Sequence, residues 1–186
     1  SDGCSSDLTF YFYQNQNFIV MKKNYKVYLA AAIMLLLHLT AGLYGQQVIT
    51  QWTFEGDLIT PSTGQGTASL TGGTTATFAT GNPGRAWNTT TYPAQGTNSG
   101  LDGVQFLTGT TGYEDIIISF DHRSSGTASR WSQLMYTLDG GSTWQIYEDN
   151  QGGLSPHDTF YSFEFDLSAI GGANDNPGFG DRKSVV

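Results

Sequence analysis

The sequence is poor in cysteine and in basic side chains. Its only cysteine is Cys4, and residues 46–180 contain no lysine and only three arginines. Without cysteine, this region has no disulfide, no thiol nucleophile and no thiolate metal site. Three positive charges against thirteen acidic residues give it a net charge of −10. Such a charge repels phosphate backbones and anionic lipid, which argues against direct binding of nucleic acid or of a membrane surface.

Long apolar runs are scarce as well. The one such run, residues 27–39, is too short for a stable membrane span, which needs ~20 residues. Lysines at positions 22, 23 and 26 precede it, and a small-residue stretch at 41–45 follows. Basic, apolar and small segments in this order are typical of a cleavable export signal that starts at Met21. We therefore predict a signal peptide over 21–45, a mature chain beginning near Gln46, and a secreted or cell-surface location.

The two ends of the chain differ from the rest. Residues 1–20 precede Met21, and we interpret them as spurious upstream translation. Residues 181–186, Asp-Arg-Lys-Ser-Val-Val, resemble a translated sequencing adapter. Their Arg182 and Lys183 stand side by side after a region without lysine. We therefore predict that the domain occupies 46–180 and lacks its last strand, because the final six residues cannot fill a hydrophobic stripe.

Helix formers are scarce between residues 46 and 180, whereas Gly, Thr, Ser and aromatic residues are abundant. Apolar and polar side chains alternate there with the period of two that indicates β-strands. The expected strands cover residues 48–55, 68–70, 76–79, 85–88, 104–106, 116–120, 130–137, 144–146 and 161–167. Their spacing, with turn signals between them, predicts an all-β fold: a two-sheet antiparallel β-sandwich of jelly-roll type.

One short motif is specific. Residues 137–144, Thr-Leu-Asp-Gly-Gly-Ser-Thr-Trp, resemble the Asp-box of sialidases and other secreted β-proteins. The aspartate of such a turn accepts hydrogen bonds from backbone N–H groups, and its glycine allows a positive φ. We therefore expect a structural turn, away from any catalytic centre. Its members are Thr137, Asp139, Gly141, Thr143 and Trp144.

Residues 120–131 contain the residue types of a hydrolytic triad in Asp121, His122 and Ser124. Sequence neighbours on one strand point to opposite faces, so Asp121 and His122 do not simply converge. We interpret the segment as a strand–loop–strand corner in which Asp121 pairs with Arg123 or Arg130. No catalytic residue is predicted.

Two weaker sets of candidate binding residues remain. Calcium prefers oxygen ligands, and sandwich domains often bind it at their rims; the candidates for a structural calcium ion are Glu55, Asp57, Asp121 and Asp166. Solvated acidic side chains are the alternative interpretation. Aromatic rings stack on the faces of sugars; the candidates for such stacking are Trp87, Tyr92, Tyr113 and Tyr147. Core packing or loop anchoring is the alternative for each of them.

Short blocks that span nearly all of residues 46–180 resemble a family of secreted bacterial β-sandwich modules. The blocks are WTFE at 52–55, TPSTG at 60–64, GNPG at 81–84, AWN at 86–88, YPAQGT at 92–97, GVQF at 103–106, SFDHR at 119–123, TASR at 127–130 and NP at 176–177. The resemblance implies a jelly-roll domain at the front of a large exported protein. Lamin-tail-like domains, nuclease domains or a C-terminal sorting signal often follow such modules. The resemblance implies no catalytic residue.

The sequence leaves three functional hypotheses open. The first is a non-catalytic extracellular module that binds carbohydrate or another polymer and positions the downstream domains of the same protein. The second is the accessory part of a secreted hydrolase, either a glycoside hydrolase or a nuclease, whose catalytic domain lies downstream. The third is a structural spacer without a ligand.

The export signal gives the first testable prediction. Cleavage after the small-residue stretch removes residues 1–45, which carry none of the alternating strand pattern. Mass spectrometry of the exported protein should therefore find an N-terminus near Gln46. A mature protein that begins at residues 1–5 would contradict this prediction.

Overall fold

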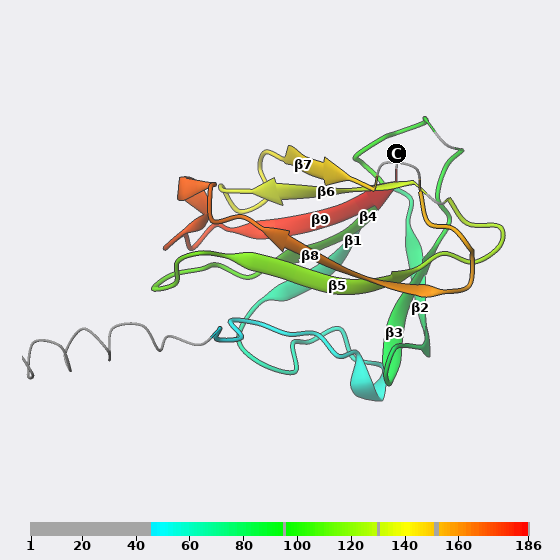
Figure 1. Cartoon of the computed structure of the whole chain (residues 1–186), viewed down its shortest axis with the longest axis horizontal. Helices are drawn as coiled ribbons and strands as arrows, with labels where there is room; N and C mark the ends of the chain where they lie inside the picture. The colour runs from blue at the N-terminus through cyan, green and yellow to red at the C-terminus, as the bar shows by residue number, and fades with distance from the viewer. Residues whose placement is uncertain (1–45, 95, 130, 151–152, 186) are drawn as a thin grey trace, which may run out of the picture. The chain divides into compact units, whose positions relative to one another are not determined.

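The computed structural model of the protein describes residues 46–94, 96–129, 131–150 and 153–185 (Figure 1). They form two short 3-10 turns, η1 (Glu55–Asp57) and η2 (Gly171–Ala173), and the strands β1 (Thr67–Thr71), β2 (Thr75–Thr80), β3 (Arg85–Thr90), β4 (Gly103–Leu107), β5 (Ile117–Arg123), β6 (Ser132–Thr137), β7 (Gln145–Asp149), β8 (Phe160–Asp166) and β9 (Gly180–Val185). Among these residues there is no helix long and apolar enough to cross a membrane.

The strands form one large sheet and two separate pairs. The large sheet has five strands in the order β1-β4-β9-β6-β7, and every pair in it is antiparallel. β2 pairs with β3, and β5 pairs with β8. In Figure 1 the β5–β8 pair runs across one face of the large sheet. The expected all-β, sandwich-like fold is confirmed.

The core lies where the β5–β8 pair meets the large sheet. Its buried residues are Ile116, Tyr136, Leu167, Ala173 and Phe179, and half-buried side chains of both layers pack against them. Burying a large apolar side chain stabilises a fold by ~1.5–3 kcal/mol. This cluster therefore contributes strongly to holding the two layers together.

The expected strand at residues 48–55 is wrong. Gln51 forms only an isolated bridge with Thr63, and Phe54 has a left-handed backbone (φ 57°) that leads into η1. The alternation of this segment reflects aromatic packing instead. The Trp52 ring lies 4.8 Å from that of Phe106 on β4, and the Phe54 ring lies 5.8 Å from that of Trp87 on β3. The other eight expected segments overlap with strands β1 to β8.

The expectation that the last strand is missing is also wrong for the structure. Gly180–Val185 form β9, which lies in the middle of the large sheet and pairs with β4 on one side and β6 on the other. Backbone hydrogen bonds do not depend on side-chain type, so a charged segment still completes the ladder. The adapter-like origin of residues 181–186 stays a prediction.

A polar hub fixes the entry into β9. The Thr110 side chain is fully buried and its backbone N–H donates to the Asn176 carbonyl at 2.7 Å. The Asn176 amide donates to the carbonyls of Gly172 (2.7 Å) and Leu138 (3.1 Å), and its oxygen accepts from the N–H of Gly178 (2.7 Å). One asparagine thus joins the turn before β9 to the loop after β6.

Two ionisable residues of β9 lie opposite large apolar or aromatic residues on both neighbouring strands. Directly opposite residues in a sheet point to the same face. Asp181 lies between Phe106 and Tyr136, and Lys183 lies between Val104 and Leu134. Burial raises the pKa of Asp181 to about 7 and lowers the pKa of Lys183 to about 8. Compared with the unfolded chain, the folded state therefore shifts both side chains towards their neutral forms.

His122 adds a third ionisable group to this interior. It lies on β5, and its Nδ1 atom is buried without a hydrogen-bond partner. Burial, with a smaller effect from the charge of Lys183, lowers the pKa of His122 to about 2. Between about pH 4 and 6.5, the effects of Asp181 and His122 on stability oppose each other. Because the pKa of the Asp181 carboxyl is raised on folding, its contribution makes the stability of the protein fall as pH rises through this range. Because the pKa of His122 is lowered, its contribution makes the stability rise with pH.

Lys183 therefore gives the clearest pH prediction. Its folded pKa of about 8 lies below the ordinary value of 10.5, so unfolding takes up a proton between these values and stability rises with pH. The free energy of unfolding should increase from pH 8 to about pH 10. Lys183→Met should raise stability at pH 8 and remove this increase. Urea denaturation at both pH values measures the effect, and identical pH profiles for the two proteins would contradict it.

Candidate functional site

The Asp139 turn between β6 and β7 is closed by side-chain hydrogen bonds. Asp139 Oδ1 accepts from the Thr143 backbone N–H at 2.9 Å and from the Thr137 hydroxyl at 2.7 Å, and Oδ2 accepts from the Thr143 hydroxyl at 2.6 Å. The Trp144 indole N–H donates to the Gly141 carbonyl at 3.0 Å, and Gly141 has a φ of 90°. All five expected turn residues thus take part in one local network.

This network shifts the ionisation of Asp139. The hydrogen bonds from the Thr143 hydroxyl and backbone, followed by that from Thr137, lower the pKa of Asp139 to about 2. The carboxylate contributes stability above its ordinary pKa of 3.8 that is lost as pH falls towards 2. With both oxygens already bonded within the turn, Asp139 has a structural role.

We expect Thr137→Val to destabilise the domain by about 1–3 kcal/mol. Thr137 is 1% exposed, and its hydroxyl oxygen accepts from the N–H groups of Asp139 (3.3 Å) and Gly141 (3.0 Å). Valine keeps the shape but leaves both donors without this acceptor. Urea denaturation measures the loss. The control is Ser142→Ala, which removes an exposed hydroxyl and should leave the midpoint nearly unchanged. Equal midpoints for both variants would contradict the structural role of the turn.

The three triad-type residues at the end of β5 do not converge. The Asp121 carboxylate accepts from the Ser162 hydroxyl at 2.6 Å, whereas His122 lies on the inner side of β5. The expected Asp121–Arg123 pair is wrong, because Arg123 pairs with Asp158 at 2.8 Å. Arg130, the other expected partner, lies outside the described residues. Ser124 contacts a different histidine, which sequence reasoning missed.

That histidine is His157, and it is held against the end of β5. The Ser124 hydroxyl lies 3.2 Å from His157 Nδ1, and Ser124 is only 3% exposed. The Asp158 N–H donates to the Ser124 carbonyl at 2.8 Å. Together with the Arg123–Asp158 ion pair, these contacts tie the loop before β8 to the corner after β5.

His157 forms part of the wall of an open depression of about 380 Å³. Three loop segments build it: the one after β3, the one between β5 and β6, and the one before β8. Its lining residues are Pro93, Ala94, Thr127, Ala128, Ser129, Trp131 and His157. Its lining thus includes an indole, two hydroxyls and an imidazole.

Hydrogen bonds within its own loop hold the backbone of Trp131. The Ser129 hydroxyl donates to the Trp131 carbonyl at 3.1 Å, and the Trp131 N–H donates back to that hydroxyl at 3.2 Å. Trp131 is half-buried and lines the depression. Sequence reasoning assigned Trp131 to a strand face and did not include it among the stacking candidates. Its place in a Gly/Ser/Thr-rich corner was the available signal.

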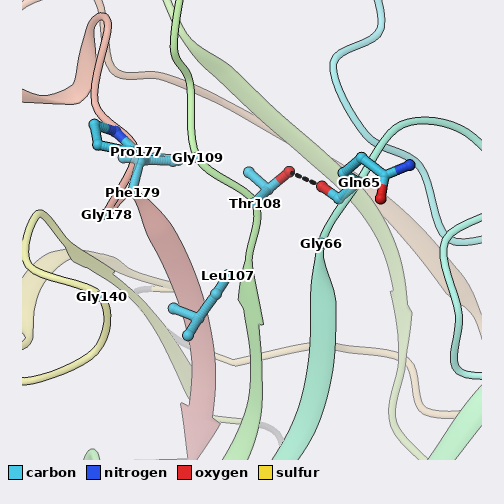
Figure 2. Close-up of a pocket in the computed structure, with 9 residues that line it drawn as sticks. All are labelled: Gln65, Gly66, Leu107, Thr108, Gly109, Gly140, Pro177, Gly178 and Phe179. Carbon is cyan, nitrogen blue, oxygen red and sulfur yellow. Dashed lines mark hydrogen bonds between the residues drawn. The ribbon is translucent and has the colours of Figure 1, made fainter.

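A second depression of about 280 Å³ lies near the Asp139 turn (Figure 2). Glycine and proline make up most of its lining, and the Thr108 hydroxyl donates to the Gln65 carbonyl at 3.2 Å across its rim. A Cβ added to Gly66 would lie 2.8 Å from the Leu107 carbonyl oxygen. Gly66 therefore allows the two backbones to lie close together. The depression offers few side-chain groups to hold a ligand.

The four calcium candidates have protein partners and do not form one site. Glu55 accepts from the Arg85 N–H, Asp57 pairs with the Arg85 side chain, and Asp166 accepts from the Ser168 N–H. Asp121 and Asp166 stand at different positions along the β5–β8 pair. The part of the chain that the structure describes contains no group of three or more His, Cys, Asp or Glu residues that could hold a metal ion.

The four stacking candidates make packing contacts. Trp87 lies in the aromatic cluster with Phe54, and Tyr113 and Tyr147 pack against the core. The Tyr147 hydroxyl donates to the Asp166 carbonyl at 2.6 Å, and the Tyr92 hydroxyl donates to Thr89 at 2.7 Å. Burial raises the pKa of Tyr92. None of the four is a lining residue of the two depressions described above.

Comparison of the chain with known protein families, with curated proteins and with solved structures finds no match. The resemblance to secreted bacterial sandwich modules therefore stays a prediction.

Proposed function

We propose that this domain is a non-catalytic extracellular module that binds carbohydrate or a similar polymer, as part of a larger exported protein. The observation that supports this most directly is the depression at residues 93–94, 127–129, 131 and 157. It combines an aromatic ring, two hydroxyl side chains and an imidazole. A ring platform with a few hydrogen-bonding groups suits a sugar, which has apolar faces and hydroxyl edges.

The contacts of the reactive residue types favour binding over catalysis. A nucleophilic serine has to reach its substrate, but Ser124 is 3% exposed. The carboxylate of Asp139 is hydrogen-bonded to Thr143, and the carboxylate of Asp158 is paired with Arg123. Among the described residues, no carboxylate is hydrogen-bonded to the ring of His157, as a triad would require. The depression thus has the groups of a binding surface without an assembled nucleophile.

Two measurements test the proposal: glycan binding by the unmodified protein and glycan binding by the variant Trp131→Ala. We expect the protein to bind at least one polysaccharide on a glycan array, because the lining of the depression includes an indole and hydrogen-bonding side chains. The substitution should weaken that binding by roughly tenfold, since truncating a central tryptophan commonly costs more than 1 kcal/mol. Isothermal titration with the best oligosaccharide from the array gives the ratio.

A matched control separates this effect from a general loss of surface apolar area. Ile146→Ala removes a side chain that is 63% exposed on β7, outside the depression, and should leave affinity unchanged. Circular dichroism verifies that both variants are folded. Absence of binding to every glycan on the array would overturn the proposed function.

A further inference from the structure

We infer that the depression binds an uncharged sugar ring of a glycan, with Trp131 as the stacking platform and His157 as the hydrogen-bonding residue that Ser124 positions. This inference rests on the proposed function and assigns the ligand class and the residue roles within the same site. Three observations carry it: the geometry of the Ser124–His157 contact, the residue types of the lining and the charge of the domain.

The Ser124–His157 contact leaves one imidazole nitrogen for a ligand. Nδ1 lies 3.2 Å from the Ser124 hydroxyl, and among the described residues no partner is bonded to Nε2. A hydroxyl at Nδ1 fixes the ring orientation, and the direction of that hydrogen bond sets which nitrogen carries the proton. Because Ser124 is buried, it acts on the ligand only through His157 and is a positioning residue.

The backbone around this pair is fixed from two sides. The Asp158 N–H donates to the Ser124 carbonyl, and the Arg123 guanidinium bonds the Asp158 carboxylate. The Tyr161 hydroxyl donates to the Pro156 carbonyl at 3.1 Å. His157 therefore projects from a loop that is anchored on β5 and β8, which limits the conformational entropy lost when a ligand binds.

The net charge of the domain favours an uncharged ligand over an anionic one. Residues 46–180 have three arginines against thirteen acidic residues, so the surrounding field repels an anionic polymer. A sugar ring without carboxylate or sulfate groups can place its apolar face on an indole and its hydroxyls against His157 and Thr127 without opposing this field.

The test measures the affinity of the protein for two sets of oligosaccharides by isothermal titration. The uncharged set contains hexamers of glucose in β-1,4 and β-1,3 linkage, of mannose and of xylose. The anionic set contains oligogalacturonate and heparin fragments. We expect binding in the uncharged set only. Preferential binding of an anionic fragment would overturn the ligand class, although the domain would still be a glycan-binding module.

Three substitutions test the residue roles. His157→Ala should weaken binding by roughly tenfold, and His157→Gln, which keeps a polar atom near the Nε2 position, should retain most of the affinity. Ser124→Ala should weaken binding by about twofold to tenfold, the range for one net hydrogen bond. It should also shift the 15N resonances of the His157 ring, which report the tautomer. A purely structural Ser124 would leave these resonances unchanged in the folded protein.

The outcomes distinguish the inference from the proposed function. If an uncharged glycan binds and neither His157→Ala nor Ser124→Ala alters its affinity, the residue assignment is overturned and the proposed function stands. If no glycan binds at all, both are overturned. Circular dichroism and a melting curve for each variant show whether a lost affinity reflects unfolding, and His157→Gln serves as the folded reference.

Discussion

The hydrogen bonds around Asn176 are the constraint on which the large sheet depends. Through Gly172, Leu138 and Gly178, this side chain aligns the segment that enters β9. β9 lies between β4 and β6, so it connects the two halves of the sheet. If the entry moved by one residue, every β9 side chain would change face. Phe179, which is 2% exposed just before the strand, would then leave the core.

The fold was predictable from the sequence where alternation reflects a two-sided strand. In β8 the inward and outward positions differ clearly in exposure. An apolar–polar period of two then correctly indicates a strand with one buried face. In residues 48–55 the same period arises from Trp52 and Phe54 contacting Phe106 and Trp87 across the domain. Local pattern does not distinguish these cases. β9 was not predicted because its side-chain composition does not indicate a strand. The backbone of β4 and β6 can pair with this segment whatever its side chains are.

The candidate site was predictable only in part. The Asp139 turn is made by residues within eight positions of one another, and its chemistry is readable from the motif. The His157 contact joins residues 33 positions apart, and no local pattern links them. The position of Trp131 in the depression was likewise not predictable from local sequence, because residues of the loops after β3 and before β8 complete the lining. Long-range placement of single side chains is the information that one sequence does not supply.

The four tryptophans of the chain occupy three distinct surroundings. Trp52 and Trp87 lie near Phe106 in one aromatic cluster. The Trp144 ring centroid lies 4.1 Å from the guanidinium carbon of Arg182, and Trp131 lines the depression. Indole emission depends on the polarity and quenching groups nearby. The protein therefore contains separate optical reporters for its aromatic cluster, its Asp139 turn and its depression, which single tryptophan-to-phenylalanine changes can resolve without any added label.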